Sequence, residues 1–510
     1  MRRDLSRRWA ATRCVLPLSV ALALTVGVGV GGAAGASPHG TAAHGTVGRG
    51  TAGERALAAV LADRFPRSGL GPGGVGQVLD AASGRVLWSA DPGAGRMPAS
   101  TAKLATAVAA LTVLGPNRTE STSTRYRAAD GTLYLVAGGD PELDPEGLGA
   151  LAADTAKALK ARGVTQVHLA LDDTLFPVPS RSPGWPPGYY PYVVAPVRAL
   201  ALVGDRTEDT AQTAARLFEQ QLAEDGVRSV AGGAGSGTPT SPSPTSPSPA
   251  PPTPTGPSGP TDPGVPPGDP GSAPEPGPDP VPPGDDGGDA AAVRAGVLST
   301  AAPRASTVPA IGRAAVPREA EPLAVHTSRP LWSTVEYMLK VSDNNIAEEL
   351  LRLTALAGNR PATWYDGTAV VTGVLAGYHV PLDGVALYDG SGLSRRDRLT
   401  ARALSALAAL TVAPAYRSVL WPVYAGMPVA GRDGTLSAAL HRFSTRPSSC
   451  AAGRVRAKTG TLHDATALAG VTRDRNGRWL AFAFLENGGT PVRTARHGLD
   501  GLAATVAGCW

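Results

Sequence analysis

The chain has 510 residues, 42% of them hydrophobic, and a formal net charge of +5. This length allows two or three domains with sizeable cores and excludes a small scaffold that depends on disulfides. Five arginines and one aspartate in residues 1–36 account for +4 of the charge, so the rest of the chain is near +1 and lacks the basic surface that nucleic-acid binding requires.

Residues 1–36 have the pattern of a secretory signal peptide. Arginines precede an apolar run from Val15 to about Val30, and Ala34-Gly35-Ala36 follows it as a candidate cleavage site. The sequence therefore predicts an exported protein of the cell envelope, the cell wall or the medium. Because the apolar run borders on spanning length, an uncleaved anchor is the alternative, which leaves membrane or cell-wall association open.

Residues 37–116 are expected to form a short lead-in and the first part of an α/β domain. Residues 37–54 are small, polar and Gly-rich, which predicts a disordered lead-in. Apolar residues then recur at helical spacing from Leu57 to Phe65. Two runs, Val75 to Leu79 and Arg85 to Trp88, predict a hairpin. We expect the first part of the domain to extend from residue 55 to residue 116.

Residues 117–322 are expected to hold an inserted α+β region of one or more domains. A strand ends at the turn around Gly138, and helices and a strand follow at about 147–161, 167–171 and 207–224. Residues 231–290 are almost entirely Pro, Gly, Ser, Thr and Asp, which predicts a disordered insertion. It is either a spacer or a tolerated expansion of a surface loop.

Residues 323–510 are expected to complete the first domain. Leu331 to Leu356 has helical spacing with an interruption at residues 341–345. Further helices are expected at about 400–411 and 494–507. Three adjacent antiparallel strands are expected at Val455 to Leu462, Ala467 to Val471 and Trp479 to Leu485.

Ser100 and Lys103 form the first candidate catalytic pair. Pro98-Ala99-Ser100-Thr101-Ala102-Lys103-Leu104 begins an apolar helix that stops at Gly115-Pro116. Residues three apart share a helix face, so we expect the Lys103 amine beside the Ser100 hydroxyl. A neutral lysine can accept the proton of a serine nucleophile, whereas a helix cap followed by a solvated lysine is the alternative for so short a motif.

Two further motifs follow in the order that the first one requires. They are Ser342-Asp343-Asn344, at the interruption of a helical pattern, and Lys458-Thr459-Gly460-Thr461, in a predicted strand. S-x-x-K, S-D-N and K-T-G together are the signature of penicillin-binding proteins and serine β-lactamases. The eight histidines lack metal-ligand spacing, so we expect neither a metal site nor a cofactor.

The chain resembles the D-alanyl-D-alanine carboxypeptidase/endopeptidase family of low-molecular-mass, class C penicillin-binding proteins. The resemblance covers about 55–230 and 320–510 and includes Gly138-Gly139-Asp140-Pro141, Ser342-Asp343-Asn344-Asn345 and Asp389-Gly390-Ser391-Gly392-Leu393-Ser394. It implies a serine β-lactamase/penicillin-binding transpeptidase-like α/β fold, an antiparallel sheet flanked by helices, with an inserted α+β domain. The family pattern gives no role to residues 231–290, and we favour a structural role for the turn at residues 389–394.

The resemblance implies three catalytic residues. The Ser100 hydroxyl attacks the D-Ala-D-Ala carbonyl, Lys103 accepts its proton, and the Ser342 hydroxyl, which both donates and accepts, relays a proton to the leaving amine. Asn344 offers an amide to the peptide group of the substrate. The backbone N–H groups of Ser100 and Thr461 are expected to form an oxyanion hole.

The third motif is expected to bind the substrate through Lys458, Thr459, Gly460 and Thr461. Lys458 places a cation beside the site, which keeps Lys103 neutral and attracts the terminal carboxylate. The hydroxyls of Thr459 and Thr461 can bind the same carboxylate, although ordinary strand propensity also explains these two threonines. Trp185 and Tyr192 either form a wall of the pocket or belong to a local aromatic cluster.

The predicted function is a serine-type D-Ala-D-Ala carboxypeptidase that acts on peptidoglycan stem peptides through an acyl-enzyme on Ser100 and is inhibited by β-lactams. Cleavage of D,D-crosslinks as a second activity stays open. The alternatives are a serine β-lactamase and a non-catalytic peptidoglycan-binding protein. A β-lactamase needs a base for deacylation, and we expect the nearest acids, Glu348 and Glu349, to face solvent.

Cysteine usage agrees with export. Cys14 lies in the predicted leader, so Cys450 and Cys509 remain as an even pair in an oxidising compartment. They are expected either to form a disulfide or to be buried free thiols. A disulfide closing this loop would contribute about 4 kcal/mol on the chain-entropy model.

Overall fold

The computed structural model describes residues 51–230 and 310–510. The predicted signal peptide at residues 1–36 and the predicted disordered insertion at residues 231–290 lie outside the described residues.

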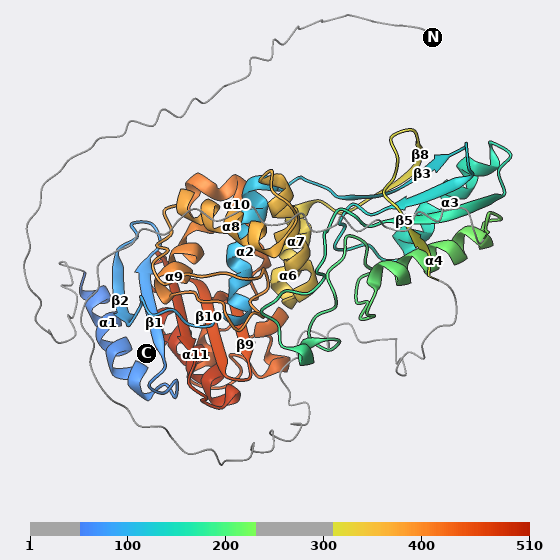
Figure 1. The fold of residues 1–510 in the computed structure, drawn as a ribbon. Helices are drawn as coiled ribbons and strands as arrows, with labels where there is room; N and C mark the ends of the chain where they lie inside the picture. The colour runs from blue at the N-terminus through green and yellow to red at the C-terminus, as the bar shows by residue number, and fades with distance from the viewer. Residues whose placement is uncertain (1–50, 231–309) are drawn as a thin grey trace, which may run out of the picture. The chain divides into compact units, whose positions relative to one another are not determined.

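A five-stranded antiparallel sheet joins the first and last strands of the described chain (Figure 1). Its strand order is β2-β1-β11-β10-β9, and every neighbouring pair is antiparallel. The predicted hairpin and the three predicted C-terminal strands are thereby confirmed. The strands are β1 (Val75–Asp80), β2 (Val86–Ala90), β9 (Arg456–Leu462), β10 (Ala465–Arg473) and β11 (Trp479–Glu486).

Helices cover both faces of this sheet. Phe482 and Phe484 of β11 pack with residues of α1 and α11 on one face. Ala483, which lies between them, belongs to the core on the other face together with Leu404 of α9. The helices are α1 (Ala52–Arg64), α2 (Lys103–Leu114), α6 (Leu331–Val341), α7 (Asn344–Ala357), α8 (Trp364–Gly377), α9 (Ala401–Leu410), α10 (Arg417–Gly426) and α11 (Val492–Val506).

A second sheet is formed by the chain between α2 and α6. Its order is β6-β5-β4-β3-β8, and β7 pairs with β5. β4, β5 and β6 are parallel, whereas β3 is antiparallel to both β4 and β8. The elements are β3 (Ser121–Arg127), β4 (Thr132–Val136), α3 (Pro145–Lys160), β5 (Gln166–Asp172), α4 (Thr210–Glu224), β6 (Arg228–Ser229), β7 (Gly312–Arg313) and β8 (Glu321–Thr327).

The structure differs from the prediction at two boundaries. The predicted division between residues 322 and 323 falls inside β8, which continues to pair with β3 as far as Thr327. The predicted disorder of residues 37–54 is wrong for residues 51–54. Thr51 caps α1, because its hydroxyl accepts from the Glu54 N–H while the Glu54 carboxylate accepts from the Thr51 N–H at 2.7 Å. The division into domains otherwise stays a prediction.

Two helices, α8 and α10, were not predicted. Glycines interrupt the helical signal in α8, where Gly367 provides the close approach to Leu351 of α7. In α10 the interior Pro422 argues against a helix. Among residues 51–230 and 310–510, no single helix is long and apolar enough to cross a membrane, and only the bent pair Ala401–Leu410 and Pro414–Gly426 passes that test, by length and composition.

Candidate active site

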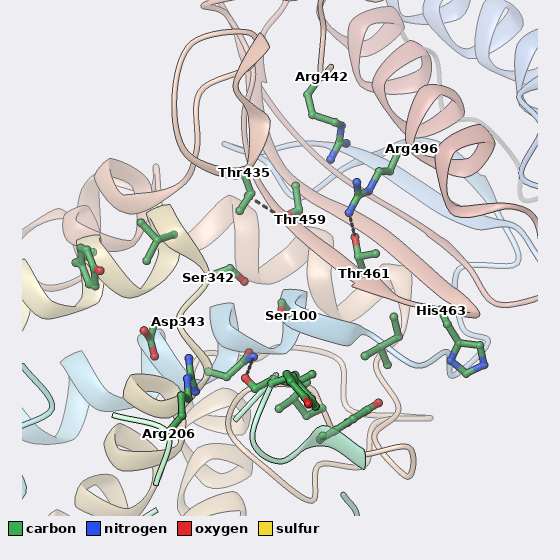
Figure 2. A pocket seen from close by; sticks show the side chains of 18 residues that line it. Ser100, Arg206, Ser342, Asp343, Thr435, Arg442, Thr459, Thr461, His463 and Arg496 are labelled. Carbon is green, nitrogen blue, oxygen red and sulfur yellow. Dashed lines mark hydrogen bonds between the residues drawn. The ribbon is translucent and has the colours of Figure 1, made fainter. Parts of the chain in front are cut away.

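The three motifs meet at one pocket (Figure 2). Ser100 lies on the 3-10 turn Ala99–Ala102 before α2, Ser342 ends α6, and Thr459 and Thr461 come from β9. Figure 2 shows the Ser100 and Ser342 side chains facing the same space. Lys103 and Lys458 lie directly behind them and are both completely buried.

Two glycines let neighbouring backbone approach the nucleophile turn. A Cβ on Gly460 would lie 2.4 Å from the Pro98 carbonyl oxygen, and one on Gly392 would lie 1.9 Å from the Ala99 carbonyl oxygen. Gly392 also has a φ of +83°, which L side chains rarely adopt. Gly460 therefore acts by allowing β9 to pack against this turn rather than by lining the pocket.

Lys103 is held by three partners that define the direction of its lone pair. Its Nζ lies 2.9 Å from Ser100 Oγ, 2.7 Å from Asn344 Oδ1 and 2.9 Å from the Ser391 carbonyl oxygen. The last two are acceptors only, so a neutral amine must donate to both of them. The lone pair of the Lys103 amine is then directed at one hydrogen-bond donor, the hydroxyl of Ser100.

Burial lowers the pKa of Lys103 to about 8, against the opposing effect of Glu348, Asp389 and Asp343. Burial also lowers the pKa of Lys458 well below its ordinary value, and the positive charges of Lys103 and Arg442 add to the effect. Two ammonium groups buried in one site are costly, so the site disfavours the charged form of both lysines.

Asn344 orients Lys103 and is itself oriented by the backbone. Its Nδ2 donates to the Val193 carbonyl oxygen at 2.9 Å, which fixes Oδ1 toward Lys103 because a carbonyl can only accept. The preceding Asp343 caps α7 by accepting from the Ile346 N–H at 3.0 Å. The amide of Asn344 has a second N–H that can serve a ligand.

Ser342 pairs with the lysine of the third motif. It ends α6 in the left-handed conformation, with φ of +63°, and its Oγ accepts from Lys458 Nζ at 2.8 Å. Lys458 Nζ also donates to the Thr459 carbonyl oxygen at 2.9 Å. The lysine thereby fixes the Ser342 hydroxyl at the pocket wall.

The two threonines of the third motif line the pocket and have protein partners. Thr459 Oγ1 lies 2.7 Å from Thr435 Oγ1, and Thr461 Oγ1 accepts from Arg496 Nη2 at 3.4 Å (Figure 2). Each hydroxyl still has a proton or a lone pair for a ligand. The sequence analysis did not identify Thr435 or Arg496, because neither lies near a motif.

Glu348 and Glu349 do not face solvent, and that expectation is wrong. Both side chains are buried, with exposed fractions of 0% and 3%. Glu348 accepts from Trp364 Nε1 at 2.8 Å, the Gly390 N–H at 3.0 Å and the Ser391 N–H at 2.7 Å. Burial raises the pKa of Glu348 to about 8 and that of Glu349 well above its ordinary value.

The two aromatic candidates have different positions. Tyr192 lines the pocket, together with Tyr189, which the sequence analysis did not single out. Trp185 instead donates from Nε1 to Asp389 Oδ2 at 2.7 Å and packs edge-on against Trp364. Trp185 therefore supports the turn at residues 389–394 and is not part of the pocket lining.

The pocket lining offers few groups that could act as an acid or bind a metal ion. Asp343 is the one carboxylate in the lining of the pocket, and it is engaged in capping α7. Within the described ranges, no group of three or more His, Cys, Asp or Glu residues is arranged to hold a metal ion.

Comparison with known proteins places the chain in a family. A carboxypeptidase of Mycobacterium tuberculosis is 30% identical over 447 residues, covering 85% of this chain and 80% of the relative. A D-alanyl-D-alanine carboxypeptidase of Actinomadura sp. is 32% identical over 445 residues, covering 81% and 77%. The crystal structure of penicillin binding protein 4 from Haemophilus influenzae has the same fold, with a TM-score of 0.62 at 19% identity over 86% of this chain and 97% of that one. The model of the D-Ala-D-Ala carboxypeptidase 3 (S13) family matches residues 54–230 and 302–506, and the chain belongs to this family.

Proposed function

We propose that this protein is a serine-type D-Ala-D-Ala carboxypeptidase that acts through an acyl-enzyme on Ser100. The observation that carries the proposal is the distance of 2.9 Å between Ser100 Oγ and Lys103 Nζ. The lysine is fully buried, and its other two partners are oxygens that can only accept a hydrogen bond. This arrangement selects Lys103 as the base for Ser100.

The remaining residues fit the other steps of the reaction. Ser100 Oγ attacks the carbonyl carbon of the penultimate D-Ala, and its proton passes to Lys103. The C–N bond then breaks, and Ser342, held by Lys458, gives its hydroxyl proton to the leaving amine of the terminal D-Ala and takes up the proton that Lys103 received from Ser100. Water hydrolyses the ester and restores Ser100. Backbone N–H groups of Ser100 and Thr461 would stabilise the oxyanion, an effect of about 3 kcal/mol per donor.

The geometry favours a peptidase over a β-lactamase. Fast deacylation needs a carboxylate or another base that activates water next to the ester. Glu348 and Glu349 are buried away from the pocket, and Asp343 is engaged as a helix cap. The buried Ser100–Lys103 contact also argues against a protein that only binds peptidoglycan, because binding does not require a nucleophile with its own base.

The proposed substrates are peptidoglycan stem peptides that end in D-Ala-D-Ala, and the proposed inhibitors are β-lactams. Support comes from the family, from relatives named as D-alanyl-D-alanine carboxypeptidase, and from the shared fold with a protein named penicillin binding protein 4. Cleavage of D,D-crosslinks remains a prediction from the sequence.

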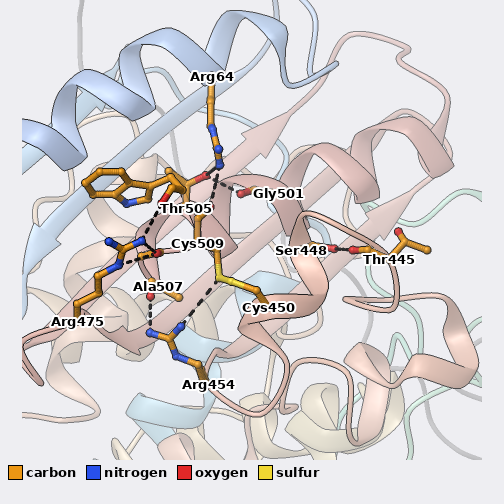
Figure 3. Close-up of a disulfide and its surroundings, with 12 residues drawn as sticks. Arg64, Thr445, Ser448, Cys450, Arg454, Arg475, Gly501, Thr505, Ala507 and Cys509 are labelled. Carbon is orange, nitrogen blue, oxygen red and sulfur yellow. Dashed lines mark hydrogen bonds between the residues drawn. A yellow bond between two sulfur atoms is a disulfide. The ribbon is translucent and has the colours of Figure 1, made fainter.

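The proposed site of action is outside the cytoplasm. The chain has a disulfide between Cys450 and Cys509, the first of the two states that the sequence left open for this pair (Figure 3). Disulfides of this kind persist in oxidising compartments. Figure 3 shows the bond beside the end of α11, where Arg64 Nη1 donates to the Cys509 carbonyl oxygen at 3.0 Å. The disulfide thus fastens the C-terminus to the chain before β9.

Removing the disulfide should lower stability. We expect the double variant Cys450→Ala/Cys509→Ala to lose about 4 kcal/mol of unfolding free energy on the chain-entropy model, because the cross-link closes a loop with a sequence separation of 59. Urea unfolding of both proteins, followed by circular dichroism, measures the difference. Equal midpoints and slopes would show that the disulfide contributes nothing.

The proposed function is tested by intact-protein mass spectrometry with benzylpenicillin and by D-Ala release from diacetyl-L-Lys-D-Ala-D-Ala. We expect one persistent adduct on the Ser100 peptide and release of D-Ala from the tripeptide. Rapid loss of the adduct with turnover of the drug would identify a β-lactamase. Absence of both the adduct and D-Ala release would identify a non-catalytic protein.

A further inference from the structure

Residues 193–197, from the chain between α2 and α6, form an irregular segment that is held by side chains of α7. The segment belongs to no helix or strand, so its buried carbonyl groups need partners from elsewhere. Asn344 Nδ2 donates to the Val193 carbonyl oxygen at 2.9 Å, and Arg352 Nη1 donates to the Val197 carbonyl oxygen at 3.1 Å. Helix α7 thus supplies hydrogen bonds to both ends of the segment.

Asn345 holds the middle of this segment through both ends of its amide. Its Oδ1 accepts from the Ala195 N–H at 3.1 Å, and its Nδ2 donates to the Ala195 carbonyl oxygen at 3.3 Å. Oδ1 also accepts from Arg206 Nη1 at 2.7 Å, which fixes the orientation of the amide because a guanidinium can only donate. Ala195 is buried, so its two backbone groups depend on these hydrogen bonds. Asn345 therefore determines where the segment lies against α7.

The segment in turn determines the orientation of the Asn344 amide. Val193 lies two residues before Ala195, and its carbonyl oxygen selects the Nδ2 group of Asn344 because a carbonyl can only accept. Oδ1 of Asn344 then faces Lys103 at 2.7 Å. If the amide turned over, Nδ2 would donate to the lone pair of the neutral lysine. That lone pair would no longer be available to the hydroxyl of Ser100.

We propose that Asn345 is a positioning residue for the catalytic base. By holding residues 193–195 against α7, it keeps the amide of Asn344 in the orientation that leaves the lysine lone pair to the nucleophile. The inference rests on the proposed function, because it requires Lys103 to act as the base of Ser100. It also gives a backbone carbonyl from the chain between α2 and α6 a part in orienting that base.

The test measures the rate constant for acylation of the full chain by saturating benzylpenicillin at about pH 9, above the Lys103 pKa of about 8. For Asn345→Ala we expect this rate constant to fall about 5- to 10-fold, the effect of about one lost oriented hydrogen bond. The drug concentration that gives the half-maximal rate should change no more than about twofold, because the lysine acts on the chemical step.

Two further variants show whether the effect passes through the lysine. Asn345→Asp keeps an acceptor for the Ala195 N–H and for Arg206, so it should recover part of the loss, and it carries the comparison if the alanine variant is unfolded. Adding Asn345→Ala to Lys103→Met should slow acylation no further, because the lone pair that Asn345 positions is already gone.

Gln212→Ala is the matched control. Gln212 of α4 holds Ile311 in the same way, since its Nε2 donates to the Ile311 carbonyl oxygen at 2.8 Å and its Oε1 accepts from the Ile311 N–H at 2.9 Å. Neither residue lines the pocket, so we expect a similar loss of thermal stability but a native rate of acylation.

Three results would overturn the proposal. They are an unchanged rate constant in the Asn345 variants, an equal fall in Gln212→Ala, and a further fall when Asn345→Ala is added to Lys103→Met. If the native chain forms no adduct on Ser100, the proposed function itself fails, and the inference fails with it.

Discussion

Replacing Lys103 with methionine should slow the acylation of Ser100 by benzylpenicillin about 10³- to 10⁴-fold, toward the upper end of what a general base contributes. The lysine lies 2.9 Å from Ser100 Oγ, and its two other partners direct its lone pair to the serine. Methionine has a similar volume but cannot accept the proton. Time courses of adduct formation by intact-protein mass spectrometry measure the rate.

The pH dependence of acylation should identify the same group. Burial lowers the pKa of Lys103 to about 8, and only the neutral amine can accept the serine proton. The rate should therefore rise about tenfold per pH unit well below pH 8 and level off above it. In Lys103→Met this rise should disappear, because the titrating group is gone.

The control for this prediction is Lys157→Met, which changes an exposed lysine on α3 and should keep the native rate and pH profile. Thermal unfolding of both variants shows whether the loss of a buried lysine has affected the fold. A Lys103→Met protein that is folded and still acylates at the native rate would require another base for Ser100.

Local sequence patterns predict the elements that carry the motifs. The strand at residues 456–462 lies within the predicted strand Val455 to Leu462, and the break between α6 and α7 follows from Ser342-Asp343-Asn344, where Asp343 caps the second helix. The turn of the nucleophile is also local, since Thr101 Oγ1 donates to the Pro98 carbonyl oxygen three residues earlier, at 2.7 Å. These features depend on neighbours in the chain and are therefore visible in its sequence.

Contacts between distant segments are not visible in the same way. Arg496 reaches Thr461 across 35 positions, and Asn344 meets the Val193 carbonyl across 151 positions. No period or spacing encodes these contacts. The motif glycines are an intermediate case, because K-T-G shows that a glycine is needed at residue 460, but only the fold shows that it allows contact with Pro98.

Helix α7 shows why the prediction for its two glutamates failed. A charged residue on an amphipathic helix is expected on the solvent face. Helix α7 instead packs against α2, α6 and α8, so most of its surface is covered and polar side chains are buried with it. Buried carboxyls need partners, and Glu348 finds them in Trp364 and in the turn at residues 389–394.

That network predicts a large loss of stability when Glu348 is replaced by alanine. Three buried donors, Trp364 Nε1 and the N–H groups of Gly390 and Ser391, would lose their acceptor. At about 1 to 3 kcal/mol for each unsatisfied donor, the unfolding free energy should fall by about 5 kcal/mol. Acylation should also slow, by about tenfold, because the Ser391 carbonyl that holds Lys103 loses its support. Urea unfolding and the benzylpenicillin time course measure the two effects.

Glu349→Ala is the matched control, since it removes the same atoms from the next position of the same buried helix. Burial raises the pKa of both glutamates, so the two variants differ in the hydrogen bonds that Glu348 accepts from Trp364, Gly390 and Ser391. We expect a loss below about 2 kcal/mol and a native rate of acylation. Equal losses in the two variants would mean that burial of the side chain matters at this helix and that the hydrogen bonds of Glu348 to the turn do not. A larger loss in Glu348→Ala, together with slower acylation, would show that this turn, and through it Lys103, depends on an acid that does not line the pocket.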